Sequence, residues 1–211
     1  MKATVYKGNG TFSVIDKNLE TLKADEVRIK VAYTGVCGTD VHIYHGMMDK
    51  RVAIPQTIGH EMSGTIDAVG EHVSDYSVGE KVVVRPLDDR LVKPSDKGYN
   101  HICAELKFIG IDSPGSMQQY WNVPAFVLHK LKPETDLKLA ALIEPLSVAV
   151  HDVKMSGLVS GETAVVLGGG PIGLLVALVA KNTGANVIIS EVNETRIKKA
   201  VEFGLQAVDP T

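Results

Sequence analysis

The residues of zinc-binding types in the first third of the chain include Cys37, His60 and Glu61. Proteins bind Zn²⁺ through cysteine thiolate, neutral imidazole and carboxylate groups, and glycines beside such ligands let the backbone turn sharply. Each residue alone is more often structural, but their joint occurrence indicates a metal site. We therefore expect Cys37 and His60 to bind one catalytic zinc ion, with Glu61 or Glu144 completing the ligand set.

A zinc ion with three protein ligands and an open position acts as a Lewis acid. An alcohol bound there is stabilised as an alkoxide, so that hydride can leave its carbon for a nicotinamide. Thr39, two residues after Cys37, is placed to accept the hydroxyl proton, and His42 to pass it to solvent through cofactor ribose hydroxyls. The expected catalytic residues are Thr39, His42 and Glu61.

A glycine-rich turn in the second half of the chain predicts a dinucleotide site. Gly168, Gly170 and Gly173 form a G-x-G-x-x-G pattern directly after an apolar run and before an apolar helix. Such a turn brings the backbone close to a pyrophosphate, which then lies at the helix N-terminus. The expected cofactor-binding residues are Gly168, Gly170, Pro171, Ile172, Gly173, Glu191 and Arg196.

Glu191 indicates which dinucleotide is bound. It follows the next apolar run, where a carboxylate binds ribose hydroxyls and repels a 2′-phosphate. The expected cofactor is therefore NAD. Arg196 stands nearby and could instead accommodate a 2′-phosphate.

The elements that must position these residues change character near residue 150. Before it, short β-type runs separated by Gly and Pro suggest a rolled, barrel-like β domain over residues 1–150. The expected strands are 3–6, 12–15, 26–33, 64–69, 81–85 and 119–128, and a mostly helical passage from 137 is expected to be interrupted at Pro145.

Residues 151–211 alternate strand and helix, which is typical of a parallel βαβ domain. Strands are expected at 163–167 and 186–190, and helices at 171–182 and 195–203. The fold class is therefore α/β, with a β domain followed by the beginning of a nucleotide-binding domain.

Composition narrows the class of partner. A formal charge of −3 gives no basic surface for nucleic acid, and the glycine turn interrupts the longest apolar run, so a membrane span is not expected. The N-terminus resembles no signal or transit peptide, and the two cysteines, Cys37 and Cys103, are expected to stay reduced. We expect a soluble cytoplasmic protein that acts on a small molecule.

At this point the sequence resembles the zinc-dependent medium-chain dehydrogenases over its whole length. Residues 59–73, GHEMSGTIDAVGEHV, match the zinc signature of that family, and residues 37–42, CGTDVH, match its cysteine-ligand segment. The resemblance implies a GroES-like catalytic domain followed by a Rossmann domain, zinc at Cys37 and His60, Glu61 as ligand or exchangeable neighbour, and a proton relay through Thr39 and His42.

The segment around Glu144 matches the place of the family's remaining ligand. A glutamate there resembles the polyol, butanediol and threonine dehydrogenases, whereas simple alcohol dehydrogenases carry cysteine. The implied substrate is a polyol such as sorbitol, with threonine or butanediol as alternatives, and a complete chain is expected to be a homo-oligomer.

Two departures from the family matter. The four-cysteine lobe that binds a structural zinc in many relatives would place its ligands at Asp89, Val92, Ser95 and Cys103, so no structural zinc is expected. Ion pairs among 88–90 and 93–97 would hold that lobe instead, or the lobe would be a mobile loop, since solvated ion pairs contribute little each. The family's chains also continue beyond this length, so we expect a fragment that is poorly active alone, or one that acts only as a nucleotide-binding or interaction module.

Overall fold

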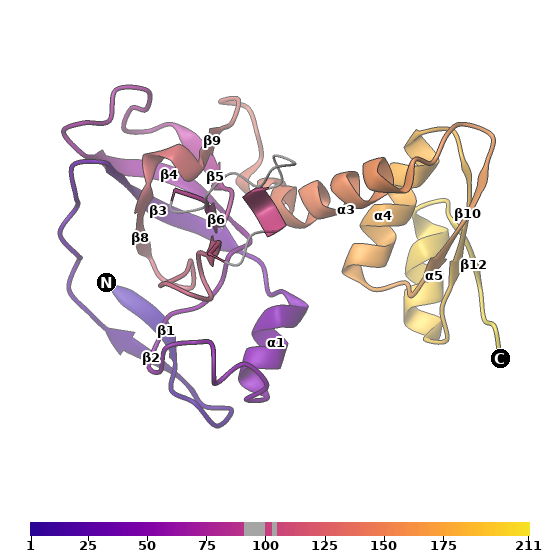
Figure 1. Cartoon of the computed structure of the whole chain (residues 1–211), viewed down its shortest axis with the longest axis horizontal. Coiled ribbons are helices and arrows are strands. Elements are labelled where there is room, and N and C mark those ends of the chain that lie inside the picture. The colour runs from indigo at the N-terminus through magenta and orange to yellow at the C-terminus, as the bar shows by residue number, and fades with distance from the viewer. Residues whose placement is uncertain (91–99, 103–104) are drawn as a thin grey trace. The chain divides into compact units, whose positions relative to one another are not determined.

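The structure, a computed structural model, describes residues 1–90, 100–102 and 105–211. Val92, Ser95 and Cys103 of the expected lobe, and the charged run 93–97, lie outside the described residues. The chain divides into two compact units, Met1–Glu144 and Pro145–Thr211 (Figure 1). The boundary expected at residue 150 falls inside a helix that begins at Ile143.

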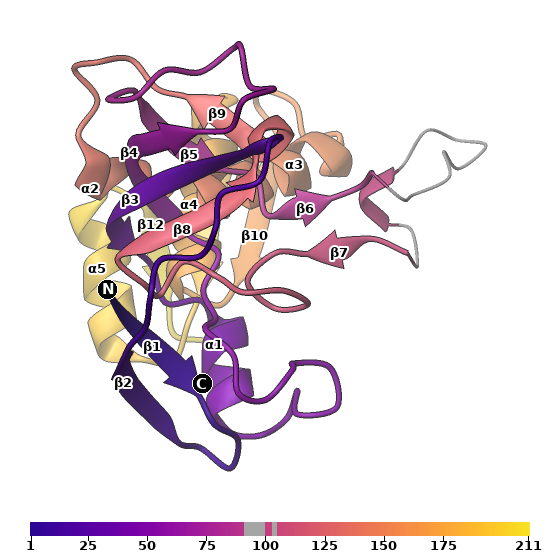
Figure 2. The same ribbon diagram turned by 90° about the vertical axis from the view of Figure 1, so that its left-hand side faces the viewer.

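The first unit is built on a five-stranded antiparallel sheet with the order β8-β3-β4-β5-β9. Its two edge strands are joined by the three residues of the short helix η2, so the sheet must curl until its edges approach, as in a barrel (Figure 2). Apolar side chains that alternate along the strands fill the interior, and Ile29, Val82 and Val123 are completely buried there. The bounds are β3 Glu26–Thr34, β4 Met62–Val69, β5 Lys81–Val84, β8 Tyr120–Pro124, η2 Ala125–Val127 and β9 Leu128–Lys130.

Smaller elements complete this unit. Two short antiparallel pairs, β1 with β2 and β6 with β7, lie beside this sheet, and helix α1 follows β3 (Figure 2). The bounds are β1 Lys2–Tyr6, β2 Phe12–Asp16, α1 Gly38–Tyr44, β6 Leu87–Asp88, η1 Asn100–Ile102, β7 Lys107–Phe108 and α2 Leu137–Ala140.

The second unit is a parallel sheet with the order β10-β11-β12, packed against helices. Its strands and helices alternate along the chain: α3 Ile143–Ser156, β10 Thr163–Leu167, α4 Pro171–Asn182, β11 Asn186–Ser190, α5 Glu194–Glu202 and β12 Gln206–Val208. Ala177, Ile189 and Ala200 are completely buried between sheet and helices. β10 forms one edge of this sheet. None of the described helices is long and apolar enough to cross a membrane.

Most expected strands and helices are confirmed, but three expectations were wrong. The run 119–128 is not one strand, because the chain turns after Pro124 into η2. Pro145 does not interrupt α3, because it lies in the first turn, where backbone N–H groups have no helical partner. A third parallel strand, β12, follows α5 where the sequence predicted no further strand.

Candidate metal centre and nucleotide turn

The fold brings Cys37, His60 and Glu61 together. One potential ligand atom from each lies within 4.8 Å of the others, and this is the one such group of three or more that the described residues form. Cys37 follows the end of β3, and His60 and Glu61 precede β4. Because Thr34 pairs with Met62 in the β3–β4 register, the two segments emerge side by side.

Cys37 occupies the N-cap of α1, a helix that the sequence did not predict. Its backbone N–H donates to Asp40 Oδ2 over 2.9 Å, which fixes the first turn. Burial raises the pKa of the Cys37 thiol, and hydrogen bonds from Thr39 partly oppose the rise. The thiol is free and half-buried, so it is available as a ligand.

His60 is 3% exposed, and its Nδ1 atom has no hydrogen-bond partner among the described residues. Burial lowers the pKa of His60 to about 4, so the imidazole is neutral at pH 7 and keeps a lone pair for a metal. The Phe108 ring lies edge-on to the imidazole, with 5.1 Å between ring centroids. A buried imidazole with an unpartnered nitrogen fits a metal ligand.

The backbone before His60 is clamped by residues 109–117, which the sequence analysis did not identify. Gly115 N–H donates to Thr57 over 2.8 Å, and Ser116 N–H donates to the Gly59 carbonyl over 2.9 Å. The approach is so close that a Cβ on Gly110 or Gly115 would lie 2.3 Å from the Gly59 oxygen. Gly59 itself has φ +100°, a conformation that favours glycine.

An ion pair between Arg51 and Asp112 also contacts the segment 109–117. Asp112 accepts two hydrogen bonds from the Arg51 guanidinium, each 2.8 Å long. Asp112 Oδ2 also accepts the backbone N–H of Phe108 over 2.8 Å. Asp112 thus connects Arg51 to the strand whose Phe108 ring faces His60.

The two candidate carboxylates differ in position. Glu61 belongs to the three-residue cluster and is 8% exposed. Burial, with the nearby Asp40 charge, raises the pKa of the Glu61 carboxyl. Glu144, in the first turn of α3, lies outside that cluster but close enough for repulsion, and burial together with the Glu61 charge raises its pKa to about 7.

The expected relay residues both belong to α1. Thr39 is half-buried beside Cys37, whereas His42 is exposed. At a spacing of three residues they lie on neighbouring positions of the helix surface. The same helix lines a mainly apolar pocket of about 290 Å³, where Tyr44 stacks on Phe12 with 6.2 Å between ring centroids.

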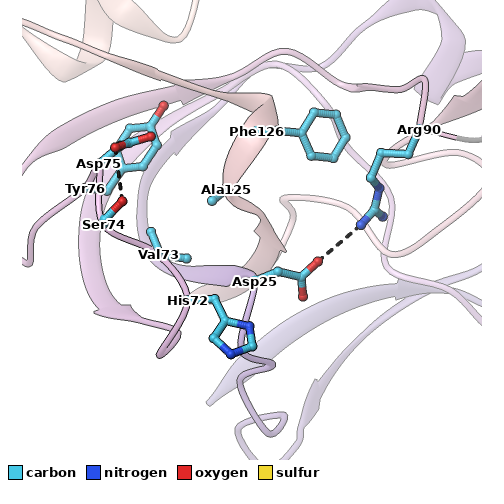
Figure 3. A pocket seen from close by; sticks show the side chains of 9 residues that line it. All are labelled: Asp25, His72, Val73, Ser74, Asp75, Tyr76, Arg90, Ala125 and Phe126. Carbon is cyan, nitrogen blue, oxygen red and sulfur yellow. Dashed lines mark hydrogen bonds and ion pairs between the residues drawn. The ribbon is translucent and has the colours of Figure 1, made fainter.

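A second pocket, of about 370 Å³, contains none of the expected site residues (Figure 3). The Arg90 guanidinium in this pocket already forms ion pairs with Asp88 over 2.6 Å and with Asp25 over 3.4 Å. Asp89, one of the expected lobe positions, lies outside the pocket and pairs with Arg85 over 3.4 Å. This pocket is therefore separate from the expected zinc and nucleotide sites.

In the second unit, the glycine turn has the geometry that its pattern predicts. Gly168 has φ +96° at the end of β10, and a Cβ on Gly173 would lie 2.0 Å from the Gly168 oxygen. Gly170 is the N-cap of α4 and Pro171 its first residue, with no side chain capping the helix. Ile172 is 40% exposed at the same end. The free N–H groups at this terminus favour an anion.

Glu191 is held beside this turn. Its Oε2 accepts the Gly169 N–H over 2.7 Å, and its Oε1 accepts the N–H groups of Val192 and Asn193 over 2.8 and 2.9 Å. These backbone donors, with Arg196 at 3.5 Å, lower the pKa of Glu191 to about 2. The carboxylate is therefore charged and fixed beside the turn.

Comparisons with known proteins agree with this architecture. Residues 23–133, just over half of the chain, match the alcohol dehydrogenase GroES-like domain. The whole chain is 56% identical to a 2-dehydro-3-deoxy-L-galactonate 5-dehydrogenase from Pseudoalteromonas atlantica, and 99% of it is 39% identical to a sorbitol dehydrogenase from Halalkalibacterium halodurans. The chain spans 62% of the length of each of these relatives.

Solved structures give the same result. A zinc-binding dehydrogenase from Sinorhizobium meliloti bound to NADP superposes with a TM-score of 0.93 at 33% identity, over 99% of this chain and 61% of that one. An alcohol dehydrogenase from Escherichia coli complexed with NADH superposes at 0.92 and 34%, over 100% and 63%. The predicted GroES-like domain followed by part of a Rossmann domain is confirmed. The chain therefore belongs to the zinc-dependent medium-chain dehydrogenase family.

Proposed function

We propose that this chain supplies the zinc-binding and nucleotide-binding parts of an NAD-linked dehydrogenase that oxidises a secondary alcohol to a ketone. The observation that carries the proposal is the buried cluster of Cys37, His60 and Glu61, whose ligand atoms lie within 4.8 Å of one another. A thiol, an imidazole and a carboxyl group are a donor set for Zn²⁺.

The electrostatics of the cluster fit a divalent cation. The pKa values of Cys37, Asp40, Glu61 and Glu144 are all raised, and that of His60 is lowered. Every shift favours the neutral form, chiefly because burial penalises charge. A bound cation would offset that penalty and stabilise the thiolate and carboxylate forms.

When bound, zinc supplies a Lewis acid for the alcohol oxygen and NAD supplies the hydride acceptor. The chain's own residues bind and orient these groups. Cys37, His60 and Glu61 would hold the metal, with Glu144 as the neighbouring carboxylate. The Thr39 hydroxyl, in the first turn of α1, would accept the proton of the substrate hydroxyl while it gives up its own proton toward the exposed His42, which would exchange that proton with solvent.

For the nucleotide, we propose that the turn Gly168–Gly173 binds the pyrophosphate and that Glu191 selects NAD. Relatives in this family bind either dinucleotide, since one solved structure holds NADP and another NADH. The fixed negative charge of Glu191 supports NAD, because it repels a 2′-phosphate.

The proposed substrate is a small polyhydroxylated molecule. The relative with 56% identity acts on a sugar acid and the relative with 39% identity acts on sorbitol. A panel of sugar acids and polyols should therefore be assayed first, with threonine and butanediol as alternatives. We propose a homo-oligomer for the complete protein.

The first test is the zinc content of protein purified without added metal, measured by mass spectrometry under native conditions. We expect about one zinc per chain, and none in Cys37→Ser or His60→Ala. His129→Ala, which changes an exposed histidine of the same unit, serves as the matched control and should keep its zinc.

Two other outcomes are informative. A value near two would contradict the expectation that the lobe binds no structural zinc, and it would leave the catalytic site in place. Metal-free protein that still binds NAD would favour a nucleotide-binding module without catalytic activity.

A further inference from the structure

We infer that Gly35 is a positioning residue for Glu61, and that its missing side chain provides the space in which the Glu61 carboxylate reaches the metal cluster. The inference rests on the proposed zinc site.

The position of Gly35 follows from the β3–β4 pairing. The pair Thr34–Met62 ends the regular register, and one residue farther on the Gly35 N–H donates to the Glu61 carbonyl over 2.7 Å. Gly35 therefore lies directly against Glu61, two residues before Cys37. The backbone that carries one expected ligand is thus bonded to the backbone of another.

The space above Gly35 is filled by the Glu61 side chain. A Cβ built on Gly35 would lie 2.2 Å from Glu61 Oε2 and 3.0 Å from Glu61 Cβ. Cβ atoms in real structures essentially never come within 3.0 Å of another heavy atom, so the carboxylate could not stay where it is. The three nearest atoms to that Cβ all belong to Glu61.

Glycine is not needed at this position for backbone conformation. Gly35 is not among the residues with positive φ, so alanine can adopt the same backbone. The atom in closest conflict, Glu61 Oε2, is the end of a flexible side chain that can rotate away. Glu61 Cβ, at 3.0 Å, needs to shift by only a few tenths of an ångström. Alanine should therefore displace the Glu61 carboxylate and leave the fold intact.

The displaced carboxylate would have little room near the cluster. Glu61 is only 8% exposed, and the charged group of Asp40 lies close enough to repel it. Rotation away from Gly35 therefore removes the carboxylate from its place within 4.8 Å of Cys37 and His60.

The test is Gly35→Ala in the full chain, with zinc affinity measured by competition against a chromophoric chelator. We expect affinity to fall roughly tenfold to a hundredfold, the range seen when groups that orient ligands are lost. The ligand-field spectrum of the Co²⁺-substituted protein should change as well, because it reports the ligand set. The melting temperature of the metal-free protein should stay unchanged.

Two comparisons isolate the mechanism. In a Glu61→Ala background, adding Gly35→Ala should change zinc affinity no further, because the carboxylate is already gone. Gly38→Ala is the matched control, since a Cβ there meets no atom within 4 Å, and its zinc affinity should equal that of the unmodified chain.

The outcomes separate this inference from the proposed function. If the unmodified chain binds no zinc, the proposed function fails. If it binds zinc and Gly35→Ala binds it equally well, the inference is overturned. A Gly35→Ala protein that is unfolded or less stable without metal, or an additive loss in the Glu61→Ala background, would also overturn it, because the glycine would then serve the fold.

Discussion

Replacing Asp112 by alanine should destabilise the first unit and loosen the support of His60. Asp112 makes three hydrogen bonds, two to the Arg51 guanidinium and one to the Phe108 N–H, each 2.8 Å long. Alanine removes all three at once. Among the described residues, Asp112 is the group that joins the Arg51 side chain to this strand through hydrogen bonds.

The size of the effect follows from exposure. The Arg51 side chain is 50% exposed and that of Asp112 is 16% exposed, so the ion pair contributes about 0.5–1 kcal/mol. Leaving the half-buried Phe108 N–H without its charged acceptor costs about 1–2 kcal/mol more. A loss of about 2 kcal/mol corresponds to a fall in melting temperature of roughly 4–8 °C for a chain of this size.

Urea denaturation of Asp112→Ala, Arg51→Ala and the double variant measures these contributions separately. Arg51→Ala should lose only the ion pair, so it should cost less than Asp112→Ala, and the double variant should cost little more than Asp112→Ala alone. Equal losses in the two single variants would refute the role of the Phe108 N–H. Additive losses would refute the coupling.

The pH dependence gives an independent check. Arg51 lowers the pKa of the Asp112 carboxyl below its ordinary value, so the folded protein holds the carboxylate more strongly than the unfolded chain. This stability is complete above the unfolded pKa of about 3.9 and is lost as pH falls through the lower folded value. Asp112→Ala should therefore lose less stability than the unmodified chain on acidification below pH of about 4.

Three further predictions concern other contacts. Gly115→Ala should cost roughly 1–3 kcal/mol and reduce zinc content, since its Cβ would lie 2.3 Å from the Gly59 oxygen; urea denaturation and metal analysis measure both. Trp121→Phe should cost about 1 kcal/mol in urea denaturation, because the indole N–H donates to the Pro114 carbonyl over 2.9 Å. Glu191→Gln should raise the affinity for NADP relative to NAD in calorimetry. The unmodified chain should also lose stability as pH falls from about 4.3 toward the folded pKa of Glu191, about 2, and Glu191→Gln should not show this loss.

The candidate ligand residues could be predicted because their chemistry is local. Cys37, His60 and Glu61 combine three metal-binding residue types in a glycine-rich setting, and the β3–β4 pairing that joins them follows from two apolar runs. The clamp could not be predicted in the same way. Gly115 meets the segment before His60 across more than fifty residues, and no periodicity encodes such a contact.

Several short elements were missed, and helix α1 and strand β12 illustrate two different reasons. Helix α1 contains glycine and three β-branched residues in seven positions, so its propensity is weak, and it begins instead through a cap. The cap was the available signal, since Asp40 lies three residues after Cys37. Strand β12 is three residues long, and its pairing with β11 in the parallel sheet defines it more than its own sequence does.

Glu191 lies beside the glycine turn, as its pattern predicts, but its hydrogen bonds favour a role different from the expected one. A carboxylate has about four hydrogen-bond acceptor sites, and in this structure three backbone N–H groups and Arg196 already approach them. Ribose hydroxyls that bind Glu191 would therefore have to share its oxygen atoms with these N–H donors or displace the donors. The same donors keep the carboxylate charged, so the selection against a 2′-phosphate that we propose would rest on repulsion more than on spare hydrogen-bonding capacity. Because Glu191 also bonds Gly169 within the glycine turn, alanine would disturb the pyrophosphate site as well as remove the charge. Glutamine keeps one acceptor oxygen, so it removes the charge and retains part of the backbone hydrogen bonding, and it therefore disturbs the turn less than alanine does.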